Sequence, residues 1–356
     1  MSLLLLLFIA ACFLAFTNGA NDNFKGVATL FGSGTTSYKG AIGWATITTL
    51  SGSIAAIFLA SALVKNFSGK GLVPDSLIQT PEFAISIALS AAITVFIATK
   101  VGMPISTTHG LVGALLGSGL VAVGMEFNFT KLGNTFLMPL IVSPLAAAAL
   151  SLLTYLLFKR LSLFFGLTKE KTLRLESSIL PLKKGALPVY VETYQGSFLG
   201  ISLQKALDTI HFLSAGVVSF ARGLNDTPKI VGLLLIIEVL DIKWGMLAIA
   251  LVMALGGLLN AKKVGEMMSK KITPMNSGQG FTANLITGLL VTTASIHGLP
   301  VSTTHVSVGS IFGIGTVTKK ADLKVIRNIL LSWILTLPLA AVCSALLYWL
   351  ISYTLS

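Results

Sequence analysis

Long apolar segments recur along almost the whole chain, and most approach the length of a membrane span. A helix needs about 20 predominantly apolar residues to cross the hydrocarbon core of a bilayer. A backbone exposed to lipid must also satisfy its own hydrogen bonds, which favours helices. The pattern therefore predicts an all-α polytopic membrane protein. Helices are expected at residues 2–18, 40–64, 83–100, 105–124, 132–158, 207–221, 229–240, 243–260, 281–297, 301–317 and 328–355.

Less apolar stretches divide this pattern. Residues 24–39 are rich in glycine and threonine, and together with 229–240 they are expected to form partial or broken helices. One long polar and basic stretch lies near the middle of the chain. It predicts three parts: a first transmembrane repeat at 1–158, a cytoplasmic loop at 159–206, and a second transmembrane repeat at 207–356.

Two polar motifs occur twice in the same order. GAND at 19–22 returns as GLND at 223–226, and GMPISTTHG at 102–110 returns as GLPVSTTHV at 298–306. The matched residues include Asn, Asp, Ser, Thr and His, so chance similarity between apolar segments does not explain them. Such self-similarity predicts that the two halves arose by duplication.

Basic residues indicate how the halves are oriented. We assume that each STTH motif lies in a helical hairpin that enters and leaves the membrane from one side. With both termini outside, most lysines and arginines then fall in the cytoplasm, as the positive-inside rule requires. This predicts an inverted-topology repeat with two re-entrant helical hairpins and broken helices, an architecture typical of secondary transporters. Reporter tags near residues 175 and 265 should both be cytoplasmic.

Composition supports a membrane protein. The chain is 54% hydrophobic and 11% charged, whereas soluble domains contain about 25% charged residues. Its net charge of +12 could suggest nucleic acid as a partner, but the basic residues lie in loops beside the spans. Membrane lipid is therefore the expected partner, and nucleic acid is not. Cys12 and Cys343 both lie in apolar runs, which excludes a disulfide framework.

Asp22 and Asp226 occupy equivalent positions in the two GxND motifs. A carboxylate inside the membrane is costly and is therefore a candidate functional group. Its alternative role is to cap the helix that follows. We expect the chain to break at Gly19 and Gly223 and expose backbone carbonyls.

Carbonyl, amide and carboxylate oxygens are hard donors that suit small hard cations, and unwound segments of transporters hold sodium in this way. The sequence therefore predicts a site for a small hard cation such as sodium, whose metal ligands include the two carboxylates. Its residues are Asn21, Asp22, Asn225 and Asp226.

The PxSTTH motifs suggest an anion site. Pro104 and Pro300 should end one helix, and the following hydroxyl residues should begin the next. A helix N-terminus offers free N–H groups and a positive dipole end. The alternative is that the hydroxyl groups only cap the two helices. We expect a tetrahedral oxyanion to bind at Ser106, Thr107, Thr108, Ser302, Thr303 and Thr304. His109 and His305 either bond these hydroxyl groups or fill the core.

Charge couples the two predicted sites. Two carboxylates and one phosphate carry about three to four negative charges, which repel strongly in a medium of low dielectric constant. Bound cations are therefore expected between the carboxylates and the anion, and such reciprocal coupling is the basis of symport. Lys25 and Lys229 either screen this charge or extend to the membrane interface. Lys100 could attract anions, or its side chain could extend to the membrane interface.

At these residues the sequence resembles the inorganic phosphate transporter family. The resemblance extends over both halves and the central loop. It implies a transporter, not an enzyme, that takes up phosphate with Na⁺ or H⁺ by alternating access, often as a homodimer in the plasma (inner) membrane. It implies that Asn21, Asp22, Asn225 and Asp226 bind the cation and that the Ser/Thr runs bind phosphate.

The chain departs from this family at two places. Residues 23–26 read NFKG, where relatives commonly have small residues, and Asn284 stands where many relatives have Glu. Asn cannot take up a proton, which favours sodium coupling. The leading hypothesis is a sodium-coupled phosphate symporter with no cofactor other than Na⁺ as coupling ion.

Alternatives remain at this point. The coupling ion could be H⁺, and the anion could be another tetrahedral oxyanion such as sulfate or arsenate. An intramembrane aspartyl hydrolase would pair Asp22 directly with Asp226 so that they share a proton. A passive anion channel would show no dependence on a cation.

Overall fold

Helices dominate the computed structural model, which describes residues 3–165, 167–174, 189–198, 200–238 and 240–355. Seven helical segments in this part of the chain are long and apolar enough to cross a membrane. Large apolar side chains such as Phe58, Leu145 and Ile334 point outward from the bundle. Such a surface suits lipid. The prediction of an all-α polytopic membrane protein is confirmed.

The first half begins with α1, continues through short helical turns, and ends with the long helix α9. The expected partial helix at 24–39 is present as η1 and α2. The elements are α1 Leu3–Asp22, η1 Lys25–Val27, α2 Ala28–Gly32, α3 Tyr38–Leu59, α4 Ser61–Phe67, α5 Asp75–Ile78, α6 Pro81–Val101, α7 Thr107–Val123, η2 Gly124–Glu126, α8 Phe129–Lys131, η3 Leu132–Leu137 and α9 Met138–Phe164.

The described residues of the central stretch form two small antiparallel sheets of two strands each, β1–β2 and β3–β4. The second half follows with the same sequence of long helices. The elements of the central stretch are β1 Lys169–Arg174, β2 Val189–Tyr194, β3 Ser197–Phe198 and β4 Ile201–Ser202. Those of the second half are α10 Leu203–Val231, η4 Gly232–Leu234, α11 Ile242–Asn260, α12 Lys262–Glu266, η5 Met267–Lys271, α13 Ser277–Ile296, α14 Thr303–Thr318 and α15 Leu323–Leu355.

Corresponding helices of the two halves pack in corresponding pairs. Helix α1 packs against α6 and α11, and its counterpart α10 packs against α13 and α3. Helix α7 packs against α15 of the other half, as α14 packs against α9. The halves therefore interlock, and both contribute to the same hydrophobic clusters. Their relative direction in the membrane stays a prediction.

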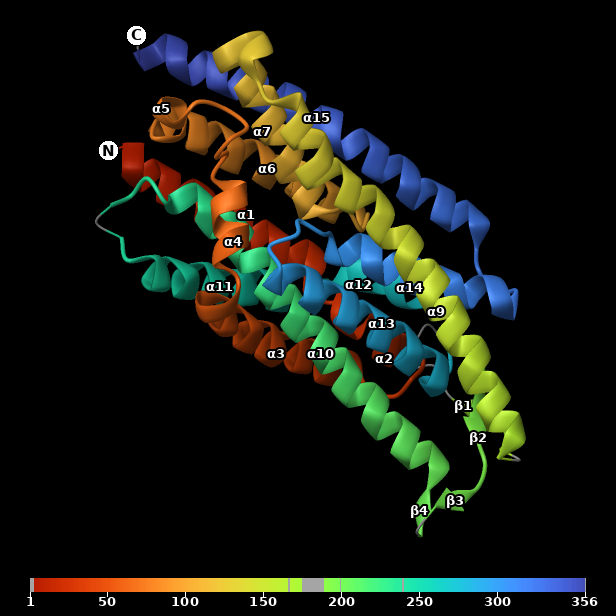
Figure 1. The fold of residues 1–356 in the computed structure, drawn as a ribbon. Helices are drawn as coiled ribbons and strands as arrows, with labels where there is room; N and C mark the ends of the chain where they lie inside the picture. The colour runs from red at the N-terminus through yellow and green to blue at the C-terminus, as the bar shows by residue number, and fades with distance from the viewer. Residues whose placement is uncertain (1–2, 166, 175–188, 199, 239, 356) are drawn as a thin grey trace.

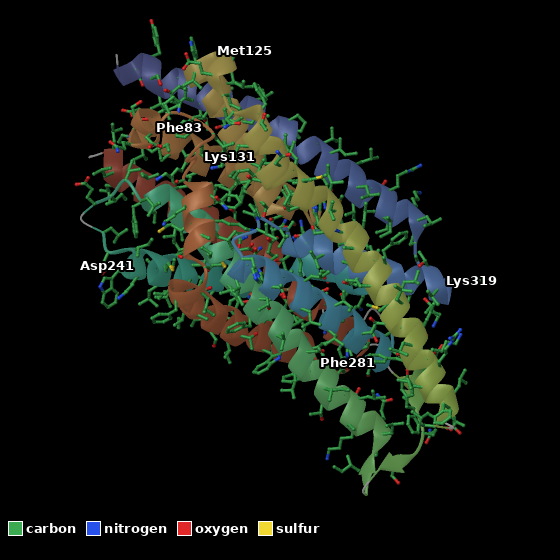
Figure 2. All side chains as sticks on the ribbon, viewed as in Figure 1. Phe83, Met125, Lys131, Asp241, Phe281 and Lys319 are labelled. Carbon is green, nitrogen blue, oxygen red and sulfur yellow. The ribbon has the colours of Figure 1, made fainter. Side chains whose placement is uncertain are left out.

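Both ends of the chain lie at one end of the bundle, and β3 and β4 lie at the other (Figure 1). Charged side chains in the connections lie at the edges of the bundle. Figure 2 shows Asp241 and Lys319 on opposite edges, each between two helices. This arrangement agrees with the expectation that the termini and the central loop face opposite sides.

The expected chain breaks at Gly19 and Gly223 are wrong. Helix α1 passes Gly19 and ends at Asp22, and α10 passes Gly223 without interruption. A Cβ atom at Gly19 would lie 1.9 Å from the Met253 carbonyl oxygen, and one at Gly223 would lie 2.0 Å from that of Thr49. These glycines therefore permit the backbones of crossing helices to touch, as small residues do between membrane helices.

We predict that Gly223→Ala destabilises the protein, because the new methyl group would overlap backbone that cannot move aside. Overpacking of this kind costs about 1–3 kcal/mol. Thermal unfolding of the purified protein in detergent measures the effect. Gly43→Ala is the matched control, because its Cβ would meet no atom within 4 Å. Equal melting temperatures for the two variants would contradict the assignment.

Candidate functional site

The two STTH motifs form equivalent tips between helices. After α6 and after α13 the chain turns through Gly102 and Gly298, whose φ angles are 77° and 70°. Ser106 and Ser302 then cap α7 and α14, and each hydroxyl group accepts the amide N–H three residues further on. Each motif therefore lies at a turn between two helices, and the re-entrant character of these hairpins stays a prediction. These two serines, predicted to bind phosphate, already perform the alternative role of capping.

The tips meet at the two carboxylates. Asp22 and Asp226 are only 3% and 4% exposed. The Asn18 side-chain amide donates to Oδ2 of Asp22 at 3.2 Å and to Oδ2 of Asp226 at 3.3 Å. Thr107 also donates to Oδ2 of Asp22 at 3.2 Å. The carboxylates thus share an amide donor between them, which differs from the direct pairing that an aspartyl hydrolase requires.

Lys25 joins the end of α1 to both tips. Its side chain is buried, so the alternative that it extends to the membrane interface is wrong. The ammonium group lies within hydrogen-bond distance of four oxygen atoms. These are Asn21 Oδ1 at 2.8 Å, Asp22 Oδ1 at 2.5 Å, the Ile105 carbonyl oxygen at 2.7 Å and Thr304 Oγ1 at 2.7 Å.

Lys229 occupies the equivalent position in the second half and is equally buried. Its ammonium group donates to Thr108 Oγ1 at 2.8 Å and to the Val301 carbonyl oxygen at 2.6 Å. It lies 3.4 Å from Asp226 Oδ1. Each lysine therefore contacts a threonine of the other half: Lys25 contacts Thr304, and Lys229 contacts Thr108. The site is built across the interface between the halves.

Arg222 is a site residue that the sequence analysis missed. It is 1% exposed, and its guanidinium group donates to Asn18 Oδ1 at 2.6 Å and to Asn23 Oδ1 at 3.0 Å. Its Nε lies 3.7 Å from Asp226 Oδ2. The separation that relates the two GxND motifs also relates Asn18 to Arg222. Comparing the residues just before the two motifs could therefore have identified both.

The charges of this cluster leave an excess of one positive charge. Lys25, Lys229 and Arg222 face Asp22 and Asp226, and all five are buried. Bound cations were expected beside the carboxylates, and the chain's own ammonium groups contact both the carboxylates and the tip threonines. A buried cationic excess attracts an anion, because electrostatic interactions are strong where the effective dielectric constant is low.

The remaining predicted residues also reach this cluster. The Asn225 amide donates to Asp226 Oδ1 at 2.9 Å and to Thr303 Oγ1 at 3.3 Å. The Asn21 amide donates to Thr99 Oγ1 at 2.9 Å. The structure therefore brings together the four residues predicted to bind sodium and all four threonines predicted to bind phosphate.

Three other polar residues lie outside these contacts. Nδ1 of His109 and of His305 lies 3.2 Å from a main-chain carbonyl oxygen, and the two rings pack edge to face. Asn284 accepts from the Thr29 hydroxyl group at 3.0 Å. The described hydrogen bonds of these residues do not include the carboxylates.

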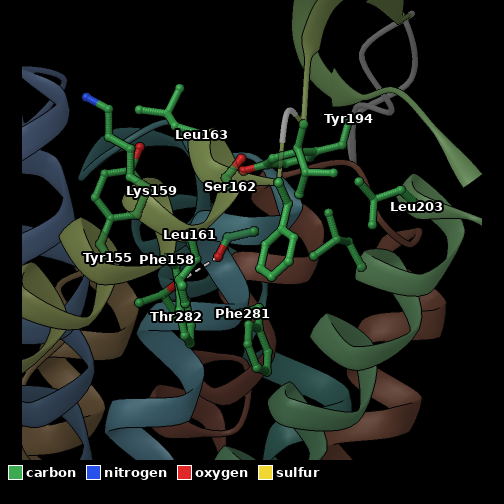
Figure 3. A pocket seen from close by; sticks show the side chains of 14 residues that line it. Tyr155, Phe158, Lys159, Leu161, Ser162, Leu163, Tyr194, Leu203, Phe281 and Thr282 are labelled. Carbon is green, nitrogen blue, oxygen red and sulfur yellow. Dashed lines mark hydrogen bonds between the residues drawn. The ribbon is translucent and has the colours of Figure 1, made fainter. Parts of the chain in front are cut away.

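One pocket lies next to the charged cluster, and a second, larger pocket lies apart from it. One of about 250 Å³ is lined by Thr99, which contacts Asn21, and by Lys100, Lys262 and Lys263. Another, of about 520 Å³, is lined mainly by apolar side chains at the ends of α9, α10 and α13 (Figure 3). It contains no residue of the charged cluster and is not the candidate site.

Comparison with known proteins identifies relatives over nearly the whole chain. The model of the phosphate transporter family matches residues 18–344. A protein of Pyrococcus abyssi, provisionally named a phosphate permease, is 26% identical over 97% of each chain. A protein of Rhizobium meliloti, named "Probable low-affinity inorganic phosphate transporter", is 27% identical over 97% of this chain and 96% of its own.

A solved structure has the same fold. The protein described as "The sodium-dependent phosphate transporter" superimposes with a TM-score of 0.81. It is 24% identical and covers 99% of this chain and 100% of its own. At this identity the likeness establishes the architecture alone.

We predict that Arg222→Gln destabilises the protein, because one partner of a buried ion pair is removed. Such a loss costs about 3–5 kcal/mol. Thermal unfolding in detergent measures it, and exposed Arg327→Gln is the matched control. Substitutions at the surface usually change stability by less than about 0.5 kcal/mol. A melting temperature of Arg222→Gln equal to that of the control would show that the cluster does not need the guanidinium group.

Proposed function

The chain belongs to the phosphate transporter family, and from this premise we propose that it takes up inorganic phosphate together with sodium, by alternating access around the buried charged cluster. It is an integral multi-pass membrane protein and not an enzyme. The observation that carries the proposal is the convergence of both carboxylates and four threonines, drawn from both halves, on one buried site.

Phosphate is proposed to bind at the two tips. Thr107 and Thr108 begin α7, and Thr303 and Thr304 begin α14, so each pair lies at the positive end of a helix dipole. Hydroxyl groups and free N–H groups are donors suited to a tetrahedral oxyanion. The lysines that now contact Thr108 and Thr304 add positive charge at the same place.

Sodium is proposed to bind at the two carboxylate oxygens that contact neither lysine, where it would displace the Asn18 amide. Oδ2 of Asp22, Oδ2 of Asp226 and Oγ1 of Thr107 surround the Asn18 amide. They are hard oxygen donors. A phosphate dianion would change the net charge of the cluster from +1 to about −1, and one sodium ion would neutralise it. The description of the structural neighbour as sodium-dependent supports this choice of ion.

Alternating access requires a path from the site to each side of the membrane. The pocket of about 250 Å³ supports such a path, because it reaches Thr99 beside Asn21 and carries three lysines at its rim. Lys262 and Lys263 belong to the side predicted to be cytoplasmic, so we propose this pocket as the inner vestibule. The outside location of both termini, the plasma (inner) membrane and the homodimer stay predictions.

The first experiment is uptake of labelled phosphate by purified protein in liposomes. We expect an inward sodium gradient to drive uptake, because the ion supplies the missing positive charge. Asp22→Asn and Asp226→Asn should each reduce uptake and its sodium dependence together. An inward proton gradient and a gradient-free sample are the controls. Uptake driven by protons alone would recast the two aspartates as proton carriers, and unchanged uptake in both variants would remove them from the cation site.

A second experiment tests the phosphate site. Thr108→Val and Thr304→Val should each raise the phosphate half-saturation constant about tenfold or more, because a hydrogen bond to a charged group is worth about 1.5–3 kcal/mol. Initial uptake rates at saturating sodium measure this constant. Thr94→Val is the matched control, because its hydroxyl group bonds only within α6 in the described contacts. Variants that lose expression but keep the wild-type constant would instead indicate that these threonines only support the fold.

A further inference from the structure

The surroundings of the Lys25 ammonium group resemble the shell of a metal ion. Four oxygen atoms lie within 2.8 Å of Nζ, and they are of four kinds: carboxylate, amide, main-chain carbonyl and hydroxyl. An ammonium group has three N–H donors, so it cannot give each oxygen a separate linear hydrogen bond. A spherical cation does not have this restriction. Such mixed oxygen shells are used for hard cations in transporters.

The equivalent shell around Lys229 is less complete. Its ammonium group has three oxygen neighbours, and the carboxylate oxygen of Asp226 is the most distant, at 3.4 Å. The Asn225 amide does not complete this shell, because its Nδ2 faces Asp226 while its Oδ1 accepts from Ser295 at 3.2 Å. Asn21 instead presents its oxygen to Lys25. The complete shell therefore belongs to the first half.

Lys25 also holds the three parts of the site together. It is buried, and its partners come from the end of α1, from the first tip at Ile105 and from the second tip at Thr304. A cation released at each transport cycle would have to make and break the same contacts. The tethered ammonium group can supply this charge without leaving.

We propose that the ammonium group of Lys25 is a tethered substitute for a transported sodium ion, so that this shell binds no exchangeable cation. The inference rests on the proposed coupling of phosphate to sodium. It means that one sodium ion fewer moves with each phosphate than in a transporter whose equivalent shell binds sodium. Replacing Lys25 by a residue that supplies an oxygen ligand should open the shell to sodium from solution.

The test is Lys25→Asn in liposomes, with initial phosphate uptake measured against sodium concentration at constant ionic strength in choline. The apparent order in sodium should rise by about one over that of the wild type. Lys65→Asn is the matched control, because that lysine is exposed and lines neither the charged cluster nor the proposed inner vestibule. Its order should equal that of the wild type.

The apparent order of uptake in sodium, compared between variant and wild type, separates the proposed sodium coupling from the proposed role of Lys25. If wild-type uptake does not depend on sodium but Lys25→Asn acquires such dependence, the sodium coupling of the wild type fails and the role of Lys25 stands. If both depend on sodium with equal order, the coupling stands and the role of Lys25 is overturned.

A second measurement covers the case in which the variant is too unstable to transport. The melting temperature of Lys25→Asn in detergent should be higher in sodium than in choline. This difference should be larger for the variant than for the wild type. The double variant Asp22→Asn with Lys25→Asn should lose this added stabilisation, because the carboxylate ligand is gone. A Lys25→Asn protein with the same melting temperature in sodium as in choline would contradict the proposal.

Discussion

Five charged side chains that are almost completely buried constrain the rest of this structure. Removing a carboxylate or an ammonium group from water costs several kcal/mol, and only close partners with good geometry repay it. Lys25 and Lys229 repay part of this cost with tip oxygens and carboxylates, and Arg222 does so with the asparagines at the interface. The helix ends and tips that carry these partners must therefore meet at one place.

The exchange of partners between the halves follows from this constraint. The lysine of each half contacts a threonine of the other, and Arg222 of the second half bonds Asn18 of the first. A site shared in this way changes whenever one half moves relative to the other. That property suits a transporter, in which relative motion of two repeats alternately exposes a central site.

Close packing of helices makes this arrangement possible. Gly19 and Gly223 let α1 and α10 touch the backbones of α11 and α3, so the two aspartates come near each other. Sequence reasoning treated the same glycines as chain breaks, because glycine has both uses. Only the presence of a neighbouring backbone decides between them, and a single sequence does not contain that information.

The sequence by itself determined the helical membrane fold, the repeated motifs and the residues of the tips. Hydropathy, helix-capping residues and repeated motifs can be identified along the chain without knowing which residues are in contact. The sequence also indicated that the carboxylates would need positive charge beside them. Only the tertiary structure decided that Lys25, Lys229 and Arg222 provide that charge, and that Ser106 and Ser302 cap helices while the threonines face the cluster. These assignments depend on contacts between residues far apart in sequence, which burial and close packing select.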